Sequence, residues 1–407
     1  MILTPNGLQI LDALAVLPLI RDKCYISTYR CFKDRNDVTT KKTPTASEEK
    51  YGYSNHRLWR SLLLDTMLKM LDSRDNIRIL YDSRLTSIHP PSPSQPGVSF
   101  DISNSHPPTT RTYQTDLLIG ADGINSTVRT ILHPTISPIY TGTTALLTHI
   151  PRSSIPWPYP HYEPNATIQD HPGALFFLPE DPACETIMVG KQTRSIPSDS
   201  ISTKSSLQAL QADKSALCTL FTDRYDEYGA TARNILDSVA AGRESIYIWP
   251  FMRLPALSTW FRPADGRVVL LGDAAHAIPP SSGQGVNQVL EDIHMLTLLF
   301  LQSRAQQEGK GDSQRGSLRF AGGKLLRLLS FWQTARQKRI DRIAGWASGV
   351  RDVARLGEEE REAGEVLRKE KKKEEEEEEE EEKDDDMAWL YIHGIEGEVR
   401  EYGMGNE

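Results

Sequence analysis

The stretch from Gly266 to Leu296 combines a glycine–aspartate turn with the start of a helix. An apolar run over residues 268–271 predicts a buried strand that ends at Gly272–Asp273. A helix is predicted to open between Gly283 and Gly285, because apolar residues follow there at helical spacing. The free N–H groups and positive dipole of such a helix start suit an anion, and the aspartate can bond sugar or polyol hydroxyls. We therefore expect an anionic or phosphate-bearing ligand at this point of the chain.

A second strand, turn and helix unit lies earlier in the chain. Leu117–Ile119 form an apolar strand that runs into Gly120, Asp122 and Gly123, and a helix is predicted from Ser126. Glycine lets the backbone approach a ligand closely, and the aspartate can either bond a hydroxyl or fix the turn. An Asp-Gly pair by itself most often marks only a turn, so the presence of two such units is the informative observation.

Two arginines, Arg57 and Arg60, precede a helix that the apolar stripe from Leu63 to Leu71 predicts. The register of that stripe places Arg60 in the first helical turn or just ahead of it. Without further context a pair of solvated arginines is the common case, and binding of an anionic ligand is the alternative.

Other kinds of catalytic site find no support in the residue pattern. There is no recognisable Ser-His-Asp set or pair of carboxylates. His276 is predicted to be a structural partner at the strand end rather than a base. The cysteines lack metal-ligand spacing and predict reduced thiols in an intracellular protein. They are Cys24, Cys31, Cys184 and Cys218.

The elements that position these residues are of two kinds. Near the N-terminus, residues 5–17 predict a short amphipathic helix, residues 34–50 an exposed polar loop, and residues 77–81 a strand. Between residues 139 and 260, short β-rich runs surround one helical stretch, Ser205–Tyr228, which predicts a mostly antiparallel sheet with a covering helix. Its aromatic residues fit either a core or the wall of an apolar substrate pocket. They include Trp157, Tyr159, Tyr162, Phe176, Phe177 and Trp249.

The C-terminal third is predicted to be helical and then strongly acidic. Residues 325–350 form a long amphipathic helix whose arginines, Arg336, Arg339 and Arg342, are assigned to a solvated face. The low-complexity stretch 358–386 is predicted to be a self-repelling, tolerated insertion. Apolar residues resume at 387–391, where we expect a clamp that docks the C-terminus onto the fold.

Composition and charge exclude several classes of protein. The chain has 407 residues, 38% of them hydrophobic and 25% charged, as in globular proteins. Its net charge of −8 comes from the acidic stretch, where 18 acidic and seven basic residues lie between Glu358 and Asp386, so the remainder carries about +3. Nucleic-acid binding is therefore not expected. No apolar run is long enough to span a membrane and no signal layout is present, so a cytoplasmic location is expected.

Three runs, in this order along the chain, resemble a known family: YGY…RLWRSLLLDTML, LLIGADGINSTVR and GDAAHAIPPSSGQGVNQVLEDI. They are similar to the FAD-dependent aromatic hydroxylases among the flavoprotein monooxygenases, and most similar to fungal secondary-metabolism members. The runs LTPNGLQILDALAV, WQTARQKRIDRI and WLY also resemble that pattern. The resemblance implies an α/β fold, in which a Rossmann-like FAD-binding domain is interrupted by a β-rich substrate domain and followed by a helical C-terminal part.

By position, the resemblance implies a role for several residues in holding FAD. Asp273 would bond the ribityl chain, and Pro279 and Pro280 would lie along the isoalloxazine edge. Arg60 is the better match to the family's flavin-binding arginine, and Arg57 is the second choice. The helix start facing the flavin carbonyl or pyrophosphate would comprise Gly283, Gly285, Val286 and Asn287, and the family's Asp-Gly motif would comprise Gly120, Asp122 and Gly123.

The activity so implied is reduction of FAD by NAD(P)H, followed by transfer of oxygen from O2 to an apolar aromatic, polyketide or terpenoid substrate. The resemblance needs neither a metal nor a side-chain nucleophile, and oligomeric state is left open. The family's first strand and G-x-G-x-x-G turn, expected before LTPNG, are absent from the sequence. A truncated, catalytically inactive relative with weak or no FAD binding is therefore one alternative, and a flavin oxidase of the same fold is another.

These patterns also divide the chain into parts. We expect two segments of the FAD-binding domain, at 1–138 and 261–355, the substrate domain at 139–260, the acidic insertion at 356–386 and a C-terminal tail at 387–407.

Overall fold

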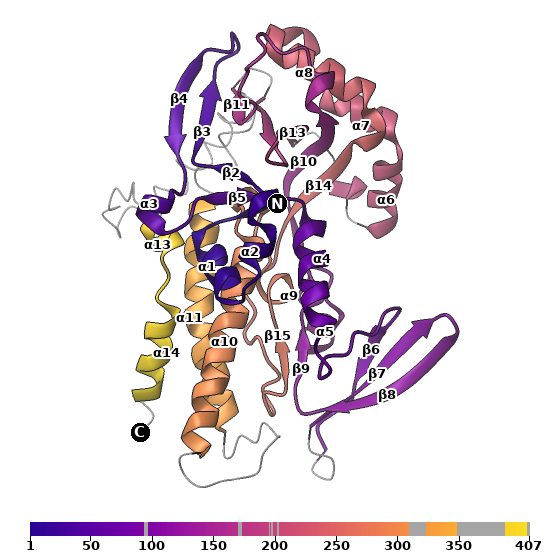
Figure 1. The fold of residues 1–407 in the computed structure, drawn as a ribbon. Helices are drawn as coiled ribbons and strands as arrows, with labels where there is room; N and C mark the ends of the chain where they lie inside the picture. Colours follow the sequence, from indigo (N-terminus) through magenta and orange to yellow (C-terminus); the bar gives the residue numbers. More distant parts are fainter. Residues whose placement is uncertain are drawn as a thin grey trace, which may run out of the picture.

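The computed structural model joins a β-rich part to a helical part that contains a small parallel sheet (Figure 1). Both parts draw on segments distant in sequence, so the chain passes between them repeatedly. The residues described are 1–92, 97–169, 173–194, 196, 198–201, 203–308, 323–347 and 387–404.

The two predicted strand, turn and helix units lie side by side. Strand β15 (Val268–Leu270) pairs in parallel with β9 (Leu118–Gly120), so the two glycine–aspartate turns leave the same end of the sheet. Within the described residues β9 has no other strand partner, and the side chain of Ile119 is exposed. The turns lead into α9 (Asp273–His276), α10 (Gly285–Glu308) and α5 (Thr127–Leu132).

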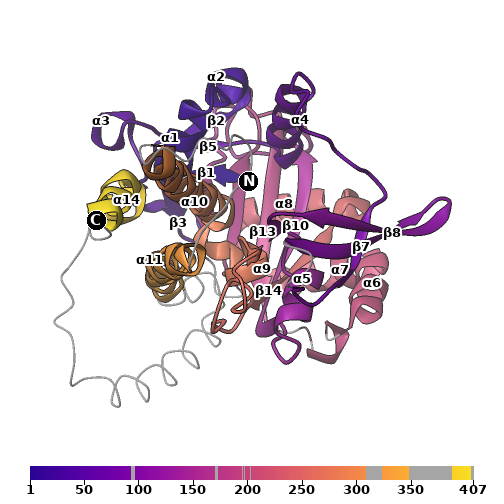
Figure 2. The same cartoon turned by 90° about the horizontal axis from the view of Figure 1, so that it is seen from below.

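Helix α11 packs beside α10, and the C-terminal segment closes against both (Figure 2). The predicted C-terminal clamp is confirmed, because Leu390 and Tyr391 are buried with Ala46 and Ile343 in one apolar cluster. The predicted insertion at 356–386 lies outside the described residues. The elements here are α11 (Lys324–Trp346), α13 (Ala388–Tyr391) and α14 (Ile395–Met404).

A seven-stranded sheet forms the core of the β-rich part, and it is wider than residues 139–260 predict. Residues 34–50 are not a loop, because an edge strand and a short helix, α3 (Glu48–Tyr51), form there. The strand's exposed side chains explain its polar sequence. In spatial order the strands are β14 (Tyr247–Arg253), β10 (Ile139–Pro151), β13 (Thr186–Thr193), β12 (Leu175–Pro179), β11 (Ala166–Ile168), β3 (Tyr29–Lys33) and β4 (Thr39–Pro44).

The two faces of this sheet differ. One is covered by helices and carries a large core that includes Trp157, Tyr162 and Phe177, so these aromatic residues are core. The other carries the smaller apolar cluster of Ala145, Leu147, Phe176 and Phe251. The covering helices are α6 (Lys204–Ala212), α7 (Lys214–Phe221) and α8 (Ala230–Ala241), the last of which the sequence patterns did not predict.

The N-terminal residues build a separate apolar cluster against α10. The predicted helix is present as α1 (Pro5–Ala13), whereas the strand predicted at residues 77–81 is absent and Ile77, Ile79 and Leu80 are exposed there. The remaining elements are β1 (Ile2–Leu3), α2 (Leu17–Ile20), β2 (Tyr25–Ser27), β5 (Asn55–Arg57), α4 (Arg60–Leu71), and a meander of β6 (Arg84–Ile88), β7 (Val98–Ser105) and β8 (Pro108–Thr115).

Candidate functional site

The turn after β15 requires glycine at position 272. Gly272 has a φ of 57°, and a Cβ there would come within 2.5 Å of Val289 Cγ2 on α10. Its backbone N–H donates to Asp292 Oδ2 at 3.2 Å, so the turn is fastened directly to helix α10. The absence of a side chain thus lets the strand end, the turn and the helix meet.

Asp273 follows at the carboxyl end of the strand with a carboxylate that is available to a ligand. The side chain is solvent-accessible, and no other described residue donates a hydrogen bond to it. Partial desolvation by the surrounding protein raises the pKa of this carboxyl, while His276 and Arg60 act in the opposite direction. A solvent-accessible carboxylate that no protein group bonds is a ready acceptor for the hydroxyls of a polyol.

The start of α10 is open on one side and tied down on the other. A Cβ at Gly285 would meet no atom within 4 Å, whereas Gly283 is left-handed with a φ of 65°. The amide of Asn287 is already used: it accepts from Thr4 N at 3.1 Å and donates to Gly283 O at 3.0 Å. Asn287 therefore holds the loop and the N-terminal strand in place. Ahead of the helix, Pro279 is partly buried and Pro280 is exposed, and Val286 in the first turn of α10 is partly buried.

The second glycine–aspartate turn is built around a helix cap. Asp122 accepts from Ser126 Oγ at 2.5 Å and Thr127 N at 2.7 Å, which satisfies free groups at the start of α5. A Cβ at Gly120 would come within 2.6 Å of Val128 Cβ, so glycine permits the close approach of strand and helix. Gly123 has a φ of 77° and open space beside it.

One residue of the site was missed by the sequence patterns. Arg129 on α5 is buried, and its guanidinium donates to Ala274 O at 3.2 Å and to Ile124 O at 2.5 Å. It thereby cross-links the two turns through their backbone carbonyls. Periodicity could not single it out, since an arginine on a short helix is usually solvated.

The structure separates the two candidate arginines. Arg57 is buried, donates through Nε to Pro179 O at 2.9 Å and forms an ion pair with Glu180, so its guanidinium joins β5 to the end of β12. Arg60 begins α4, is exposed, and lies over the ring of Trp249 at 5.1 Å from the centroid. Only Arg60 is placed where it could reach a ligand.

An aromatic surface of the seven-stranded sheet lies under Arg60. The ring of His149 is tilted against that of Trp59 with centroids 4.7 Å apart, and its Nε2 lies 3.0 Å from the hydroxyl of Tyr247. The far end of β14 reaches the predicted cofactor loop, because Leu254 N donates to Ala277 O at 3.2 Å. The end of β14 is therefore held beside the loop that follows Asp273, and Trp249 on the same strand lies under Arg60.

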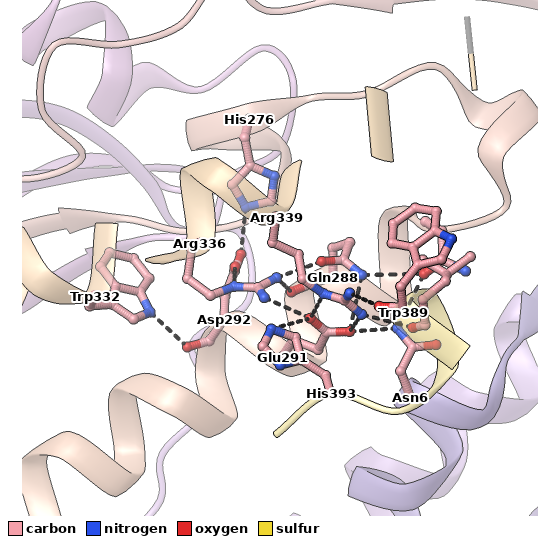
Figure 3. A network of polar contacts seen from close by, with 12 residues as sticks. Asn6, His276, Gln288, Glu291, Asp292, Trp332, Arg336, Arg339, Trp389 and His393 are labelled. Atoms are coloured by element: carbon pink, nitrogen blue, oxygen red, sulfur yellow. Dashed lines mark hydrogen bonds and ion pairs between the residues drawn. The ribbon is translucent and has the colours of Figure 1, made fainter. Parts of the chain in front are cut away.

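Behind the turn lies a buried polar network that the sequence interpretation placed in solvent (Figure 3). Arg336 is 0% exposed and donates to Asp292 Oδ1 at 2.8 Å and Glu291 Oε2 at 2.6 Å. Arg339 also pairs with Glu291, at 2.8 Å, so the prediction of a solvated arginine face was wrong for both residues. The pattern of apolar residues on α11 could not predict that these arginines are buried, because their acidic partners lie on another helix, α10.

The network confirms the structural reading of His276. Its Nε2 lies 2.6 Å from Asp292 Oδ2, the same oxygen that accepts from Gly272 N. Asp292 thus joins the turn, α10 and α11, and no catalytic step is needed to explain the histidine.

We expect acidification to loosen the C-terminal segment through His393. Burial and then Arg339 lower the pKa of His393 to about 4. The unfolded histidine titrates near pH 6.5, so docking is strongest above that pH and weakens as pH falls toward 4. The expected loss is about 2 kcal/mol at pH 5. Hydrogen exchange over residues 387–404 at pH 7 and pH 5 measures it.

His393→Gln should flatten this pH dependence, whereas His294→Gln, which removes a more exposed histidine paired with Glu396, serves as the control. Equal protection of wild-type residues 387–404 at both pH values would contradict the expectation.

A parallel strand pair with two glycine–aspartate turns, a helix start and an interposed sheet defines a dinucleotide-binding α/β protein. The FAD binding domain family matches residues 63–310. The chain belongs to this family.

Comparisons with individual proteins agree with this assignment. The chain is 26% identical over 270 residues to a kynurenine 3-monooxygenase of Salinispora tropica, covering 60% of this chain and 51% of that protein. It is 32% identical over 151 residues to a salicylate hydroxylase of Pseudomonas putida, covering 36% and 30%. The chain thus spans about half the length of the kynurenine 3-monooxygenase and less than a third of the salicylate hydroxylase.

The solved structure of a salicylate hydroxylase substrate complex has the same fold, with a TM-score of 0.68 at 19% identity over 98% of this chain and 89% of that one. None of the helices among the described residues is both long and apolar enough to cross a membrane.

The residues present fit part of FAD. The unpartnered carboxylate of Asp273 suits the hydroxyls of a ribityl chain, and the open backbone at Gly285 suits a carbonyl or phosphate oxygen at the start of α10. Asn287 and Asp122 have their polar side-chain atoms bonded within the protein, so their contribution is to hold these two groups in place.

Proposed function

We propose that the protein is an FAD-dependent monooxygenase that uses NAD(P)H and O2 to hydroxylate or epoxidise an apolar aromatic small molecule. The observation that carries this proposal is that the loop after Asp273 is bonded to the end of β14, the strand whose Trp249 lies under Arg60. A cofactor held at the turn would meet a substrate lying on that face. The names of the relatives, which include monooxygenases and hydroxylases of aromatic compounds, support the same reaction class.

In this proposal the chain's own residues bind and orient rather than react. Asp273 bonds the ribityl hydroxyls, Gly285 and Val286 present backbone N–H groups, and Arg60 contributes positive charge beside the ring. Pro279 and Pro280 line the ring edge without offering a competing proton donor. The second turn, with Gly120, Asp122 and Gly123, and the loop at Gly283 and Asn287 fix the position of these contacts.

FAD, when bound, supplies the acceptance of hydride from NAD(P)H and the activation of O2. The protein's part is to exclude water and to hold the substrate over the ring. We propose that the substrate lies at Trp249, which is 37% exposed on the same side of the sheet as the buried cluster of Leu147, Phe176 and Phe251. This surface fits an aromatic substrate of secondary metabolism, and polyketide or terpenoid skeletons are the wider class that we propose.

Purification of the full chain, with and without added FAD, tests the proposal. We expect a flavin absorbance band that co-elutes with the protein, is bleached by NADPH without oxygen, and returns with oxygen. Absence of bound flavin at saturating FAD would favour a catalytically inactive relative. Flavin that is reduced by an organic substrate but not by NADPH or NADH would favour an oxidase.

Asp273→Asn should weaken FAD binding about 10- to 100-fold, since a hydrogen bond to a charged acceptor contributes roughly 1.5–3 kcal/mol. The melting temperature of the FAD-free protein should stay equal or rise slightly, because the carboxylate is solvent-accessible, only partly desolvated, and bonded by no other described residue. Titration of FAD followed by flavin fluorescence gives the affinity. Asp341→Asn, on the exposed side of α11, is the matched control and should leave both quantities unchanged. Unchanged FAD affinity in Asp273→Asn would refute the assigned contact.

A further inference from the structure

Gln192 on β13 is a buried amide without a partner. The residue is 2% exposed, and neither its Oε1 nor its Nε2 has a hydrogen-bond partner among the described residues. An amide in this condition costs free energy in the folded protein, because both atoms lose their bonds to water. A ligand that supplies the missing donor and acceptor would account for a buried amide at this position.

Strand alternation places this side chain on the face that looks toward the cofactor loop. Its neighbour Lys191 lies on the opposite, helix-covered face, over the ring of Tyr228 at 5.1 Å. Gly190, two residues before Gln192, faces Phe176 and Leu147, since a Cβ there would come within 2.1 Å of the Phe176 ring. Gln192 therefore belongs to the aromatic face.

Within that face Gln192 forms one row with Ala145 and Trp249 across three neighbouring strands. Two interstrand spacings separate Gln192 from Trp249, which is about 10 Å. Trp249 lies under Arg60, and β14 continues from it toward Ala277 of the cofactor loop. The row thus starts beside the proposed flavin and ends at the unpartnered amide.

The chemistry of the amide selects the kind of ligand. A primary amide offers one acceptor and one donor side by side, and it carries no charge. A carboxylate would satisfy the Nε2 donor but leave Oε1 facing negative charge, and its own charge would be buried beside a side chain that is 2% exposed. A carboxamide satisfies both atoms without burying a charge.

We propose that Gln192 anchors the substrate and selects an aromatic compound of about two fused rings that carries a neutral carboxamide-like edge. This rests on the proposed function, because it assumes that the substrate lies on the aromatic face. The two-ring size follows from the span of the row, which places one end of the ring system near Trp249 and the amide edge at Gln192.

The test compares three ligands of one shape: 3-hydroxy-2-naphthamide, 3-hydroxy-2-naphthoate and 3-methyl-2-naphthol. Their dissociation constants are measured with the FAD-loaded chain and again without FAD, using the fluorescence of its tryptophans. In the wild type we expect the naphthamide to bind at least about tenfold more tightly than the other two. In Gln192→Leu the three affinities should fall within about threefold of one another.

Thermal unfolding separates this role from a structural one. Gln192→Leu should melt at the wild-type temperature or higher, because it replaces an unsatisfied amide by an apolar group of similar size. The control is Gln211→Leu, whose amide is fully bonded to the backbone of Ile246 and Ile248 at 3.1 and 2.9 Å. That variant should melt lower and keep the preference for the naphthamide.

A lower melting temperature in Gln192→Leu, an unchanged ligand preference, tightest binding of the naphthoate, or binding of none of the three compounds would each overturn the proposal. Loss of flavin binding in the wild type would instead refute the proposed function, and the measurements without FAD would still decide the role of Gln192.

Discussion

Replacement of Arg336 by leucine should lower the free energy of unfolding by about 3–5 kcal/mol, because it removes the fully buried cation that Glu291 and Asp292 share. Arg339 still pairs with Glu291 and His276 with Asp292 in this variant. Arg336 is 0% exposed and pairs with both Glu291 and Asp292. Burial by itself would raise the pKa of each carboxyl, and the pKa of both is nonetheless held low, with Arg336 acting on both. Chemical denaturation at pH 7 measures the difference.

The pH dependence gives a second reading of the same change. In the wild type the depressed carboxyl pKa values stabilise the fold above pH of about 4, and this stability is lost as pH falls below it. In Arg336→Leu the loss of the shared cation raises the pKa of both carboxyls relative to the wild type, so protonation in the folded state begins at a higher pH. The gap between variant and wild type should therefore be smaller at pH 5 than at pH 8.

Arg342→Leu is the matched control, since Arg342 lies on the same helix, is exposed, and lies over the ring of Trp389 at 4.3 Å from the centroid. Its cost should stay below about 1 kcal/mol. Equal destabilisation by the two variants would show that α11 tolerates the loss of the buried cation, and would contradict the assigned network.

Arg57→Met should destabilise the protein by about 3–5 kcal/mol as well, because it leaves Glu180 buried without its partner. This ion pair joins β5, next to the start of α4, to the end of β12 in the seven-stranded sheet. Its loss should also release the aromatic face from its position against Arg60. Urea denaturation gives the stability, and FAD affinity reports the position of Arg60.

A double variant distinguishes the loss of the attraction between Arg57 and Glu180 from the cost of leaving Glu180 buried without a partner. Arg57→Met with Glu180→Met should be more stable than Arg57→Met alone, since no unpaired charge then remains buried. The exposed pair of Arg21 and Glu48, which are 3.3 Å apart, provides the comparison, and Arg21→Met should cost less than about 1 kcal/mol. A double variant no more stable than Arg57→Met would refute this account.

The ion pairs of Arg57 and Arg336 show what sequence patterns could not predict about the site. Arg57 and Arg60 are equivalent by spacing, and only the burial of Glu180 beside Arg57 assigns one to structure and leaves the other available. Arg129 is a comparable case, because its acceptors are backbone carbonyls, which leave no trace in the pattern of side chains.

The sequence by itself determined the local units: the strands before each glycine–aspartate turn, the helix start at Gly285, the amphipathic α11 and the class of ligand. These follow from backbone conformation and from periodicity, which act over a few neighbouring residues. The tertiary structure alone decided which polar atoms are already bonded and which remain unpartnered, as in Asn287 and Gln192. That difference depends on contacts between residues far apart in the chain, and it determines which of them can bind a ligand.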